Sequence, residues 1–526
     1  MGAPSTFLVR GAYGIIFFTA VGILNQLKGI ESMFAKKPQI VGASVYVRTL
    51  GGKRVRYVNL DNTATTPAFL EVRDAVSGFM EYYGSIHRGS GYKCLFSTWL
   101  YEHCRRRVRN FVSADPNYHE VLFTANTTSA INKAARVLKL TKKDVVLVSE
   151  IEHSSNDLPW RQCASLCRYG VNRDNQINLE SISSELLRLG QRVKLITVAG
   201  ASNVTGQISP YHEIAEIAHR YGVPIFVDGA QLVPHRHITM GEEKDPRHLD
   251  FLSFSGHKLG APYGSGVLIG PSRFFAPRNI PPDEPGGGTA DVVTDDVAFW
   301  SASPDRFEAG TPNAAGVVAL AKAIEVLQNC GMSNVAAHET RLWRRACAGL
   351  KRIRNLVLYV DPDDHLIHTP VLPFNLERYP HGLVAAILGF EYGIGVRHGR
   401  HCADSLVLRL LRLGKRQSAR IIRDVVDKGM VSHVYGVVRP SIGICNNEVD
   451  IDRLLDAVER IARDGTRFKY EPEFIQHGRA RTRLRQTGEY LPVGRSVDDL
   501  LGLGSPPQVL TSIANFDFSK DSHRME

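Results

Sequence analysis

The stretch "DFLSFSGHKLGAPYGSGVLIG" (Asp250–Gly270) decides the fold of this chain. Two apolar runs within it, "FLSF" and "GVLIG", are typical of buried strands and flank a short glycine-rich segment. That segment contains Lys258. Because a lysine is costly to bury unless its charge is matched or its pKa falls, an amine at this place predicts a chemical role.

The chain around this stretch alternates apolar strands with amphipathic helices. Further strands are expected at 121–123, 144–150, 193–200 and 224–230, and a long helix at 313–331. The alternation predicts an α/β fold with a mostly parallel, doubly wound sheet, followed by a smaller α+β domain. The expected regions are an N-terminal arm (1–57), a large domain (58–330), a small C-terminal domain (331–465) and a polar tail (466–526).

Polar residues gather where the predicted strands end. They follow five strands in turn: Thr127 and Thr128, then Glu152 and His153, then Asn203, then Asp228 and Gln231, and finally Ser255, His257 and Lys258. Ligands of open α/β sheets bind outside the carboxyl ends of the strands. The convergence of five strand ends therefore predicts a pocket at this edge of the sheet.

Lys258 and Asp228 have the chemistry that pyridoxal phosphate (PLP) requires. A lysine with a lowered pKa can form a Schiff base with an aldehyde, and a carboxylate can pair with the ring nitrogen. Thr127 and Thr128 open a helix, and a helix N-terminus favours a phosphate. The remaining assignments are Ser255 and His257 as further phosphate donors, His153 stacked on the ring and Gln231 on the ring hydroxyl.

Each assignment has a purely structural alternative. Asp228 could simply end a strand, His153 could be a solvent-facing loop histidine, and the threonine pair could only cap a helix. Their joint occurrence beside "SGHK" (255–258) favours the cofactor site.

Composition excludes several other classes of protein. The chain has 526 residues, 43% of them hydrophobic, and a formal net charge of +11 that is concentrated in local arginine clusters. No nucleic-acid motif accompanies the charge, so we expect no nucleic-acid partner, whereas an acidic protein partner or an anionic ligand stays open. The eight cysteines form no C-x-x-C pair, which argues against a disulfide framework or a zinc site and favours a reducing compartment.

The N-terminus carries the uncharged stretch "GAYGIIFFTAVGILNQ" (11–26). It is short for a membrane-spanning helix, which needs about 20 apolar residues. We expect an arm that packs on the body of a cytoplasmic protein, with organelle targeting or membrane association of residues 1–40 as the alternative.

The motifs along residues 58–462 resemble those of class V, fold-type I PLP enzymes, in the group II cysteine desulfurase and selenocysteine lyase branch. They run in family order: "LDNTATTP" (60–67), "IHRGSGY" (86–92), "FTANTTSAIN" (123–132), "EHSSNDLPWR" (152–161), "ASNVTGQI" (201–208), "VDGAQLVPH" (227–235), "SFSGHKLGAPYGSGVLIG" (253–270), "GGGT" (286–289), "FEAGTPN" (307–313), "GVRHGRHCA" (395–403) and "VRPSIGICNNEVDIDRL" (438–454).

The resemblance implies a role for each matching residue. Lys258 is expected as the Schiff-base lysine, with Asp228 on the pyridinium nitrogen and His153 stacked on the ring. The resemblance further implies ring contacts from Asn203 and Gln231, a phosphate cup of Thr128, Ser255 and His257, and a phosphate contact from Thr289 of a second subunit in a homodimer with shared sites. Arg439 is expected to grip the substrate carboxylate, with Arg397 and Asn203 as further substrate contacts.

Cys402 is expected to attack the sulfur of the bound cysteine and to keep it as a persulfide for an acceptor protein. Arg397, Arg400 and His401 lie close in sequence, and positive charge favours the reactive thiolate. The expected reaction is conversion of L-cysteine to L-alanine. The alternatives are a selenocysteine lyase, or an epimerase, a C–S lyase or an aminotransferase of the same fold, and a non-catalytic scaffold.

Several residues depart from the family pattern. Arg400 stands where a second histidine is common, His398 where a small residue is common, and Thr63 replaces an alanine. The segment "LVLRLLRLGKRQSARIIRDVVDKGM" (406–430) lengthens the connection between Cys402 and Arg439 and is expected to be helical.

Overall fold

The computed structural model describes residues 37–172, 175–361, 363, 367–427, 435–466 and 468, with four short strands nearer the chain ends. These are β1 (Arg10–Gly11), β2 (Gly14–Ile15), β20 (Tyr470–Glu473) and β21 (Arg481–Leu484). Most of the apolar stretch at 11–26 and of the tail after 466 lies outside the described residues, so the expectations for both stay predictions. No helix within the described ranges is both long and apolar enough to cross a membrane.

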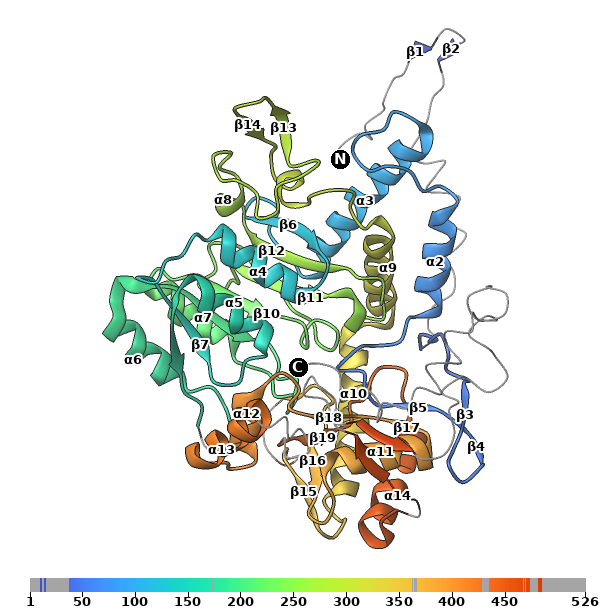
Figure 1. Ribbon diagram of the computed structural model, residues 1–526. Coiled ribbons are helices and arrows are strands. Elements are labelled where there is room, and N and C mark those ends of the chain that lie inside the picture. Colours follow the sequence, from blue (N-terminus) through green and yellow to red (C-terminus); the bar gives the residue numbers. More distant parts are fainter. Residues whose placement is uncertain are drawn as a thin grey trace, which may run out of the picture.

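A seven-stranded sheet forms the centre of the molecule (Figure 1). Its strand order is β6-β12-β11-β10-β9-β7-β8, and only β12 runs against its neighbours. The mostly parallel α/β fold is therefore confirmed. The strands are β6 (His119–Thr124), β7 (Val145–Ser149), β8 (Ser165–Tyr169), β9 (Val193–Ala199), β10 (Ile225–Asp228), β11 (Phe251–Ser255) and β12 (Gly266–Pro271).

Helices cover both faces of this sheet. In β7, Val145 and Leu147 pack in one hydrophobic cluster while Val146 and Val148 pack in another, as the alternation of side chains along a strand requires. The surrounding elements are α2 (Leu70–Met80), α3 (Tyr92–Phe111), α4 (Thr127–Val137), α5 (Leu158–Cys163), α6 (Leu179–Leu189), α7 (Tyr211–Arg220), α8 (Ser272–Phe275) and α9 (Ala314–Cys330), with short 3-10 turns η1 (Ser154–Asn156), η2 (Gly190–Arg192), η3 (Gly256–Lys258) and η4 (Asp305–Phe307).

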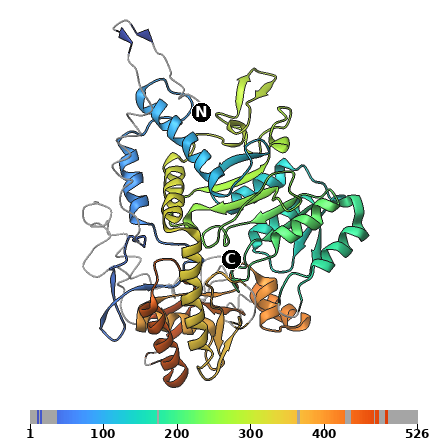
Figure 2. The same cartoon turned by 180° about the vertical axis from the view of Figure 1, so that it is seen from behind.

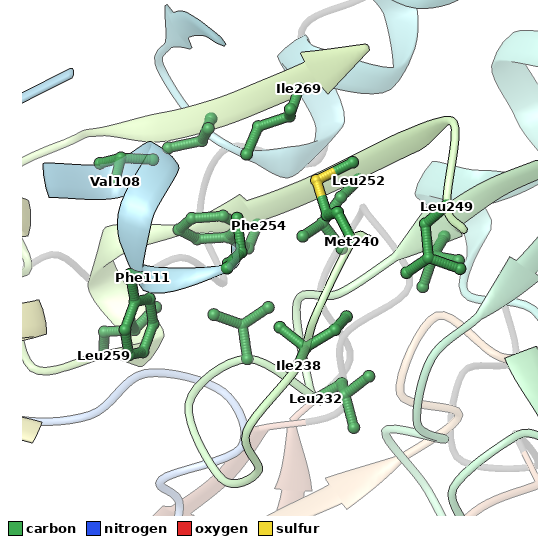
Figure 3. Packing of buried hydrophobic residues seen from close by; sticks show 14 of the residues in the cluster. Val108, Phe111, Leu232, Ile238, Met240, Leu249, Leu252, Phe254, Leu259 and Ile269 are labelled. Carbon is green, nitrogen blue, oxygen red and sulfur yellow. The ribbon is translucent and has the colours of Figure 1, made fainter. Parts of the chain in front are cut away.

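The opening stretch of sequence contributes to both clusters: Phe254 and Ile269 pack in the larger one, and Phe251 and Leu268 pack in the smaller one. Val108 and Phe111 of α3 lie over Phe254 and Ile269 of β11 and β12 (Figure 3). The two apolar runs pair antiparallel, with Ser255 opposite Gly266. This packing fixes the turn that carries Lys258.

A second, smaller unit contains an antiparallel sheet with the order β15-β16-β19-β18. Helix α10 leads into it directly after α9, as the view from behind shows (Figure 2). Its elements are α10 (Met332–Leu350), β15 (Leu356–Leu358), β16 (Phe374–Leu376), α11 (His381–Tyr392), β17 (Ile394–Gly395), β18 (Arg397–Gly399), α12 (Asp404–Leu410), α13 (Lys415–Val426), β19 (Val437–Arg439) and α14 (Glu448–Asp464).

A strand near the start of the described chain joins the smaller unit. Strand β5 (Val58–Asn59) pairs parallel with β17, and Val58 and Leu60 pack in the core of the smaller unit. The domain boundaries expected from sequence stay predictions. Two hairpins project from the body: β3 (Tyr46–Arg48) with β4 (Arg54–Arg56), and β13 (Ala290–Val293) with β14 (Ala298–Trp300). The segment after Cys402 forms α12 and α13, so its expected helical character is confirmed.

Candidate active site

A cavity of about 470 Å³ lies at the carboxyl ends of the parallel strands, with walls from both units. Every site residue expected from the sequence except Thr289 lines this cavity: Thr127, Thr128, His153, Asn203, Asp228, Gln231, Ser255, His257, Lys258, Arg397, Cys402 and Arg439. Residues from five strand ends and from the second unit thus meet in one place.

Lys258 ends the turn η3 that follows β11. Its carbonyl accepts the hydroxyl of Thr66 at 2.9 Å, and the backbone N–H of Thr66 donates to the His257 carbonyl at 2.9 Å. Burial lowers the pKa of the Lys258 amine to about 8, although Asp228 opposes the shift. An amine with this pKa is partly neutral near pH 7 and can react as a nucleophile.

Asp228 is the last residue of β10 and is 5% exposed. One of its carboxylate oxygens accepts the N–H of Ala230 at 3.0 Å. Burial raises its pKa, and nearby Lys258 partly offsets that rise. Lys258 and Asp228, both described, form no ion pair within 4.0 Å, so the carboxylate stays available to a cationic ligand atom.

The N-terminus of α4 lines another part of the cavity wall and presents hydrogen-bond donors there. Asn126 caps the helix by accepting the N–H of Ser129 at 2.9 Å. Thr127 donates its N–H to the Ser255 hydroxyl at 2.8 Å, and the hydroxyl of Thr128 lies 2.6 Å from that of Ser155. Hydroxyls and backbone N–H groups at a helix N-terminus make a phosphate-binding set.

Gly266 allows this helix to start so close to the sheet. A Cβ at position 266 would lie 2.5 Å from the Cα of Asn126. Any larger residue would push the N-terminal end of α4 away from β12. The glycine-rich segment therefore shapes the cavity as well as the turn that bears Lys258.

His153 precedes the turn η1, and its Nδ1 accepts the N–H of Ser155 at 3.1 Å. Burial, helped by Lys258 and Arg439, lowers its pKa to about 4. The ring is neutral at pH 7, and the accepted hydrogen bond places its own proton on Nε2. The neighbouring Glu152 is buried and accepts hydrogen bonds from Asn156 at 2.7 Å and from the Ala199 N–H at 2.8 Å.

Asn203 and Gln231 each use a side-chain amide to hold another segment of the wall. Asn203 donates to the His401 carbonyl at 2.7 Å, and Gln231 donates to the Thr63 carbonyl at 2.8 Å. Both residues therefore connect the cavity to loops that are distant in sequence.

Cys402 is exposed on the cavity wall in an unusual turn. His401 and Cys402 have φ values of +56° and +53°, although neither is glycine. Left-handed backbone at two successive side-chain-bearing residues costs energy and is found where surrounding contacts impose it. Residues in such strained conformations cluster at functional sites.

The positive charge expected around Cys402 is smaller than the sequence suggests. Burial, together with Arg439, lowers the pKa of His401 well below its usual value, so its ring is neutral. Arg400 pairs with Asp404 at 2.9 Å, one helical turn away. The expectation that His401 adds charge beside the thiol is therefore wrong, because burial and the nearby charge of Arg439 both disfavour protonation of its ring.

Arg439 is 2% exposed and lies on the wall with Arg397. One Nη of Arg439 donates to the Asn203 carbonyl at 2.9 Å, and the other lies 3.3 Å from Asp61. Burial lowers the pKa of Arg439 to about 10, so the guanidinium stays charged at pH 7. A buried cation with unused N–H groups suits a carboxylate.

Thr289 is the one expected site residue that does not line the cavity. It is buried, and its hydroxyl donates to the Gly286 carbonyl at 2.8 Å. Its expected contact with the cofactor of a second subunit stays a prediction.

The structure adds cavity residues to which the sequence interpretation gave no role in the site: Ala64, Ala125, Asn126, Ser155, Ala199, Ala201, Ala230, Pro262 and Gly264, together with Thr63 and His401, which it had noted only as a departure from the family pattern and as a neighbour of Cys402. Most lie within the quoted motifs, next to a residue that was singled out. Small residues carry no chemical signal of their own. Only their place within a motif, next to a reactive residue, could have indicated that they line the cavity.

Comparisons with known proteins agree with this geometry. A model of the aminotransferase class-V family matches residues 58–454. A probable cysteine desulfurase of Halalkalibacterium halodurans is 32% identical over 413 residues, which cover 77% of this chain and 92% of that protein. A probable cysteine desulfurase of Staphylococcus aureus is 33% identical over 421 residues, covering 78% and 93%.

Solved structures give the same result. An apo cysteine desulfurase of Thermococcus onnurineus has a TM-score of 0.67 and 28% identity, covering 77% of this chain and 95% of its own. The cysteine desulfurase CsdA of Escherichia coli has a TM-score of 0.64 and 27% identity, covering 77% and 94%. The chain therefore belongs to the aminotransferase class-V family, in the branch that contains the cysteine desulfurases.

Proposed function

We propose that this protein is a PLP-dependent cysteine desulfurase that converts L-cysteine to L-alanine and receives the sulfur on Cys402. One observation carries the proposal: Cys402 lies on the wall of the same cavity as Lys258 and Arg439. A thiol, an amine and a carboxylate-binding cation within one cavity are what removal of sulfur from an amino acid requires.

Membership of the family implies PLP, and the residues present fit it. Asp228 offers a buried carboxylate without an ion-pair partner in the described part of the chain, and the α4 N-terminus offers donors for a phosphate. Lys258 offers an amine with a lowered pKa. When bound at these residues, PLP supplies an electron sink for carbanion chemistry on the amino acid.

The protein groups position the amino acid and move its protons. Arg439 binds the α-carboxylate through its unused N–H groups. The amine of Lys258 accepts a proton in its neutral form and returns it in its charged form. His153 can donate from Nε2, because its Nδ1 is occupied by the Ser155 N–H.

The sulfur transfer itself needs Cys402. Its Sγ, as thiolate, attacks the substrate sulfur, so that an S–S bond forms and the C–S bond breaks. The electron pair of the broken bond stays on carbon, which then takes up one proton to give the methyl group of alanine. The number of protons balances, because the thiolate form of Cys402 released one proton beforehand.

The first experiment is the absorption spectrum of the purified protein before and after addition of L-cysteine, with alanine and sulfide measured in the same sample. A cofactor band that changes, with production of alanine, would support the proposal. Cys402→Ser should keep the band but lose at least about 100-fold in alanine production, whereas Lys258→Ala should lose the covalent band.

Cys163→Ser is a matched control, because Cys163 does not line the cavity and serine keeps the donor to the Trp160 carbonyl. Full turnover by Cys402→Ser would contradict the persulfide step. A band that ignores cysteine would move the function to an epimerase, a C–S lyase or an aminotransferase.

The partners are part of the same proposal. We infer a homodimer with shared sites and an acceptor protein that takes sulfur from the exposed Cys402. Exposed apolar side chains on α3 and on the β13–β14 hairpin support the dimer: Leu95 is 59% exposed, Val293 70% and Phe299 58%. Sedimentation of the purified protein tests this inference, and a monomer at micromolar concentration would contradict it.

A further inference from the structure

Two histidines and one aspartate form a cluster at the other end of the central sheet from the cavity. His219 lies in the last turn of α7, and His248 and Asp250 lie just before β11. Asp250 directly precedes that strand, whereas Lys258 follows its other end. Two ring nitrogens and a carboxylate oxygen of the cluster lie within 4.8 Å of one another. None of these three residues lines the cavity.

Both rings are held through Nδ1 by backbone carbonyls. The Nδ1 of His219 lies 2.7 Å from the Pro246 carbonyl oxygen, and the Nδ1 of His248 lies 2.6 Å from that of Asp245. Because a carbonyl oxygen only accepts, each Nδ1 carries a proton and donates it. In a neutral ring, Nε2 is then a free acceptor. Metal-binding histidines are held in this way, with the other ring nitrogen donating to a carbonyl or a carboxylate.

Both Nε2 atoms face the carboxylate of Asp250, which is itself an acceptor. The separations are 2.9 Å from His219 to Oδ2 and 3.6 Å from His248 to Oδ1. The Ile225 N–H and the Tyr118 hydroxyl donate to the same two oxygens. His248 is 7% exposed, and its Nε2 has no hydrogen-bond partner among the described residues. Two lone pairs and a buried carboxylate require positive charge between them.

One divalent cation meets this requirement better than two protons. The rings of His219 and His248 stack with centroids 4.1 Å apart and planes at 15°. Two protons would produce two stacked imidazolium rings, which repel each other. A divalent ion supplies the same charge and leaves both rings neutral. The separations of 2.9 and 3.6 Å lie on either side of the roughly 3.3 Å between ligand atoms of a tetrahedral zinc ion.

Arg273 is a competing cation near this cluster. One Nη lies 3.7 Å from Asp250, and the other lies 3.7 Å from Glu243. Its side chain is half exposed, so solvent and salt screen its charge, and Glu243 offsets it. Arg273 therefore leaves the buried acceptors without a matching charge of their own.

We infer that His219, His248 and Asp250 bind a divalent transition-metal ion of the Zn²⁺ class through the two Nε2 atoms and the carboxylate. Imidazole ligands favour Zn²⁺ over Mg²⁺, which prefers oxygen ligands and water. The His219 side chain is 17% exposed, which leaves an entry path and room for a solvent ligand. The ion would join the end of α7 to the start of β11. Its role is to stabilise the large unit, independently of the reaction proposed for the cavity.

Zn²⁺ binding to the purified full-length protein tests the inference. After dialysis against a chelator, the dissociation constant for Zn²⁺ is measured by competition with a chromophoric chelator. His219→Gln and His248→Gln should each weaken binding at least about 100-fold, since loss of an outer-shell partner alone costs about 10- to 100-fold. Far-UV circular dichroism checks that each variant is folded. If His248→Gln does not fold, the variant of the partly exposed His219 decides.

Two controls should bind Zn²⁺ like the wild type. His212→Gln alters a histidine on the same helix, whose Nδ1 lies 2.8 Å from the Arg247 carbonyl oxygen but which is outside the cluster. Cys402→Ser removes the thiol of the cavity. In addition, Zn²⁺ should raise the midpoint of thermal unfolding of the wild type and of His212→Gln but not of His219→Gln, because an ion that binds only the folded chain stabilises it. Mg²⁺ should raise none of them.

Three results would overturn the inference. Equal Zn²⁺ binding by the wild type and His219→Gln would show that the cluster is not the site. Loss of Zn²⁺ binding in Cys402→Ser would place the ion in the cavity. A wild-type protein that binds no Zn²⁺ would show that protons supply the positive charge between the rings and Asp250.

Discussion

Ser154 holds the carbonyl oxygen of Cys402 with two donors, its backbone N–H at 2.7 Å and its hydroxyl at 3.0 Å. Ser154 directly follows His153, so the same short turn positions both the imidazole ring of His153 and the thiol of Cys402. The contact joins the large sheet unit to the strained turn at His401 and Cys402. Residues of both units therefore determine the position of the Cys402 thiol.

Ser154→Ala should reduce the rate of persulfide formation on Cys402 by roughly 5-fold, since one of the two bonds that hold the turn is lost. Rapid quenching followed by mass spectrometry of the Cys402 peptide measures that rate. Ser183→Ala removes a hydroxyl bonded to a helix carbonyl in α6 and serves as the control. An unchanged persulfide rate would show that the backbone N–H alone holds the turn.

Arg439→Lys should raise KM for L-cysteine by at least about 10-fold while kcat changes less. Lysine keeps the charge but not the planar fork that Asp61 and Asn203 orient. Steady-state kinetics separates the two effects. The control is Arg345→Lys on α10, whose side chain is half exposed. A loss confined to kcat would mean that Arg439 acts in the chemical step rather than in binding.

Stability should fall as the pH is lowered, in part because of His153. Its pKa of about 4 in the folded protein lies below the unfolded value of about 6.5, so the unfolded chain binds more protons between these values. The stabilising contribution is complete above pH 6.5 and is lost as the pH falls towards 4. From pH 7 to pH 5 it decreases by about 2 kcal/mol.

His153→Asn removes this titration while keeping an acceptor for the Ser155 N–H. The variant should show a smaller fall in the free energy of unfolding between pH 7 and pH 5 than the wild type, measured by urea denaturation at both pH values. Equal slopes in the two proteins would contradict the lowered pKa.

Leu252→Ala should destabilise the protein by about 3 kcal/mol, because it leaves a cavity in the cluster drawn in Figure 3. Leu252 is 0% exposed in β11, an interior strand of the seven-stranded sheet. Leu187→Ala is the matched control, since Leu187 is 72% exposed on α6 and should lose less than about 0.5 kcal/mol. Urea denaturation measures both, and similar values for the two variants would contradict the assigned packing.

The sequence alone was sufficient to predict six of the seven strands of the large sheet, because buried strands of such sheets are continuous apolar runs. It also indicated which residues end those strands, and the motif order indicated the family. Strand β8 was not predicted, since "SLCRY" (165–169) is only partly buried and lacks the apolar run of its neighbours. Thr289 could not be tested, because its expected contact requires a second chain.

The tertiary structure decided the electrostatics of the site. The sequence shows His401 beside Cys402 and two arginines nearby, which suggests a cluster of positive charge. Only the fold shows that burial keeps His401 neutral and that Asp61, more than 300 positions away in the chain, pairs with both Arg397 and Arg439. Periodicity and propensity are local properties of a sequence, whereas a pKa and a charge balance depend on distances between residues that folding brings together.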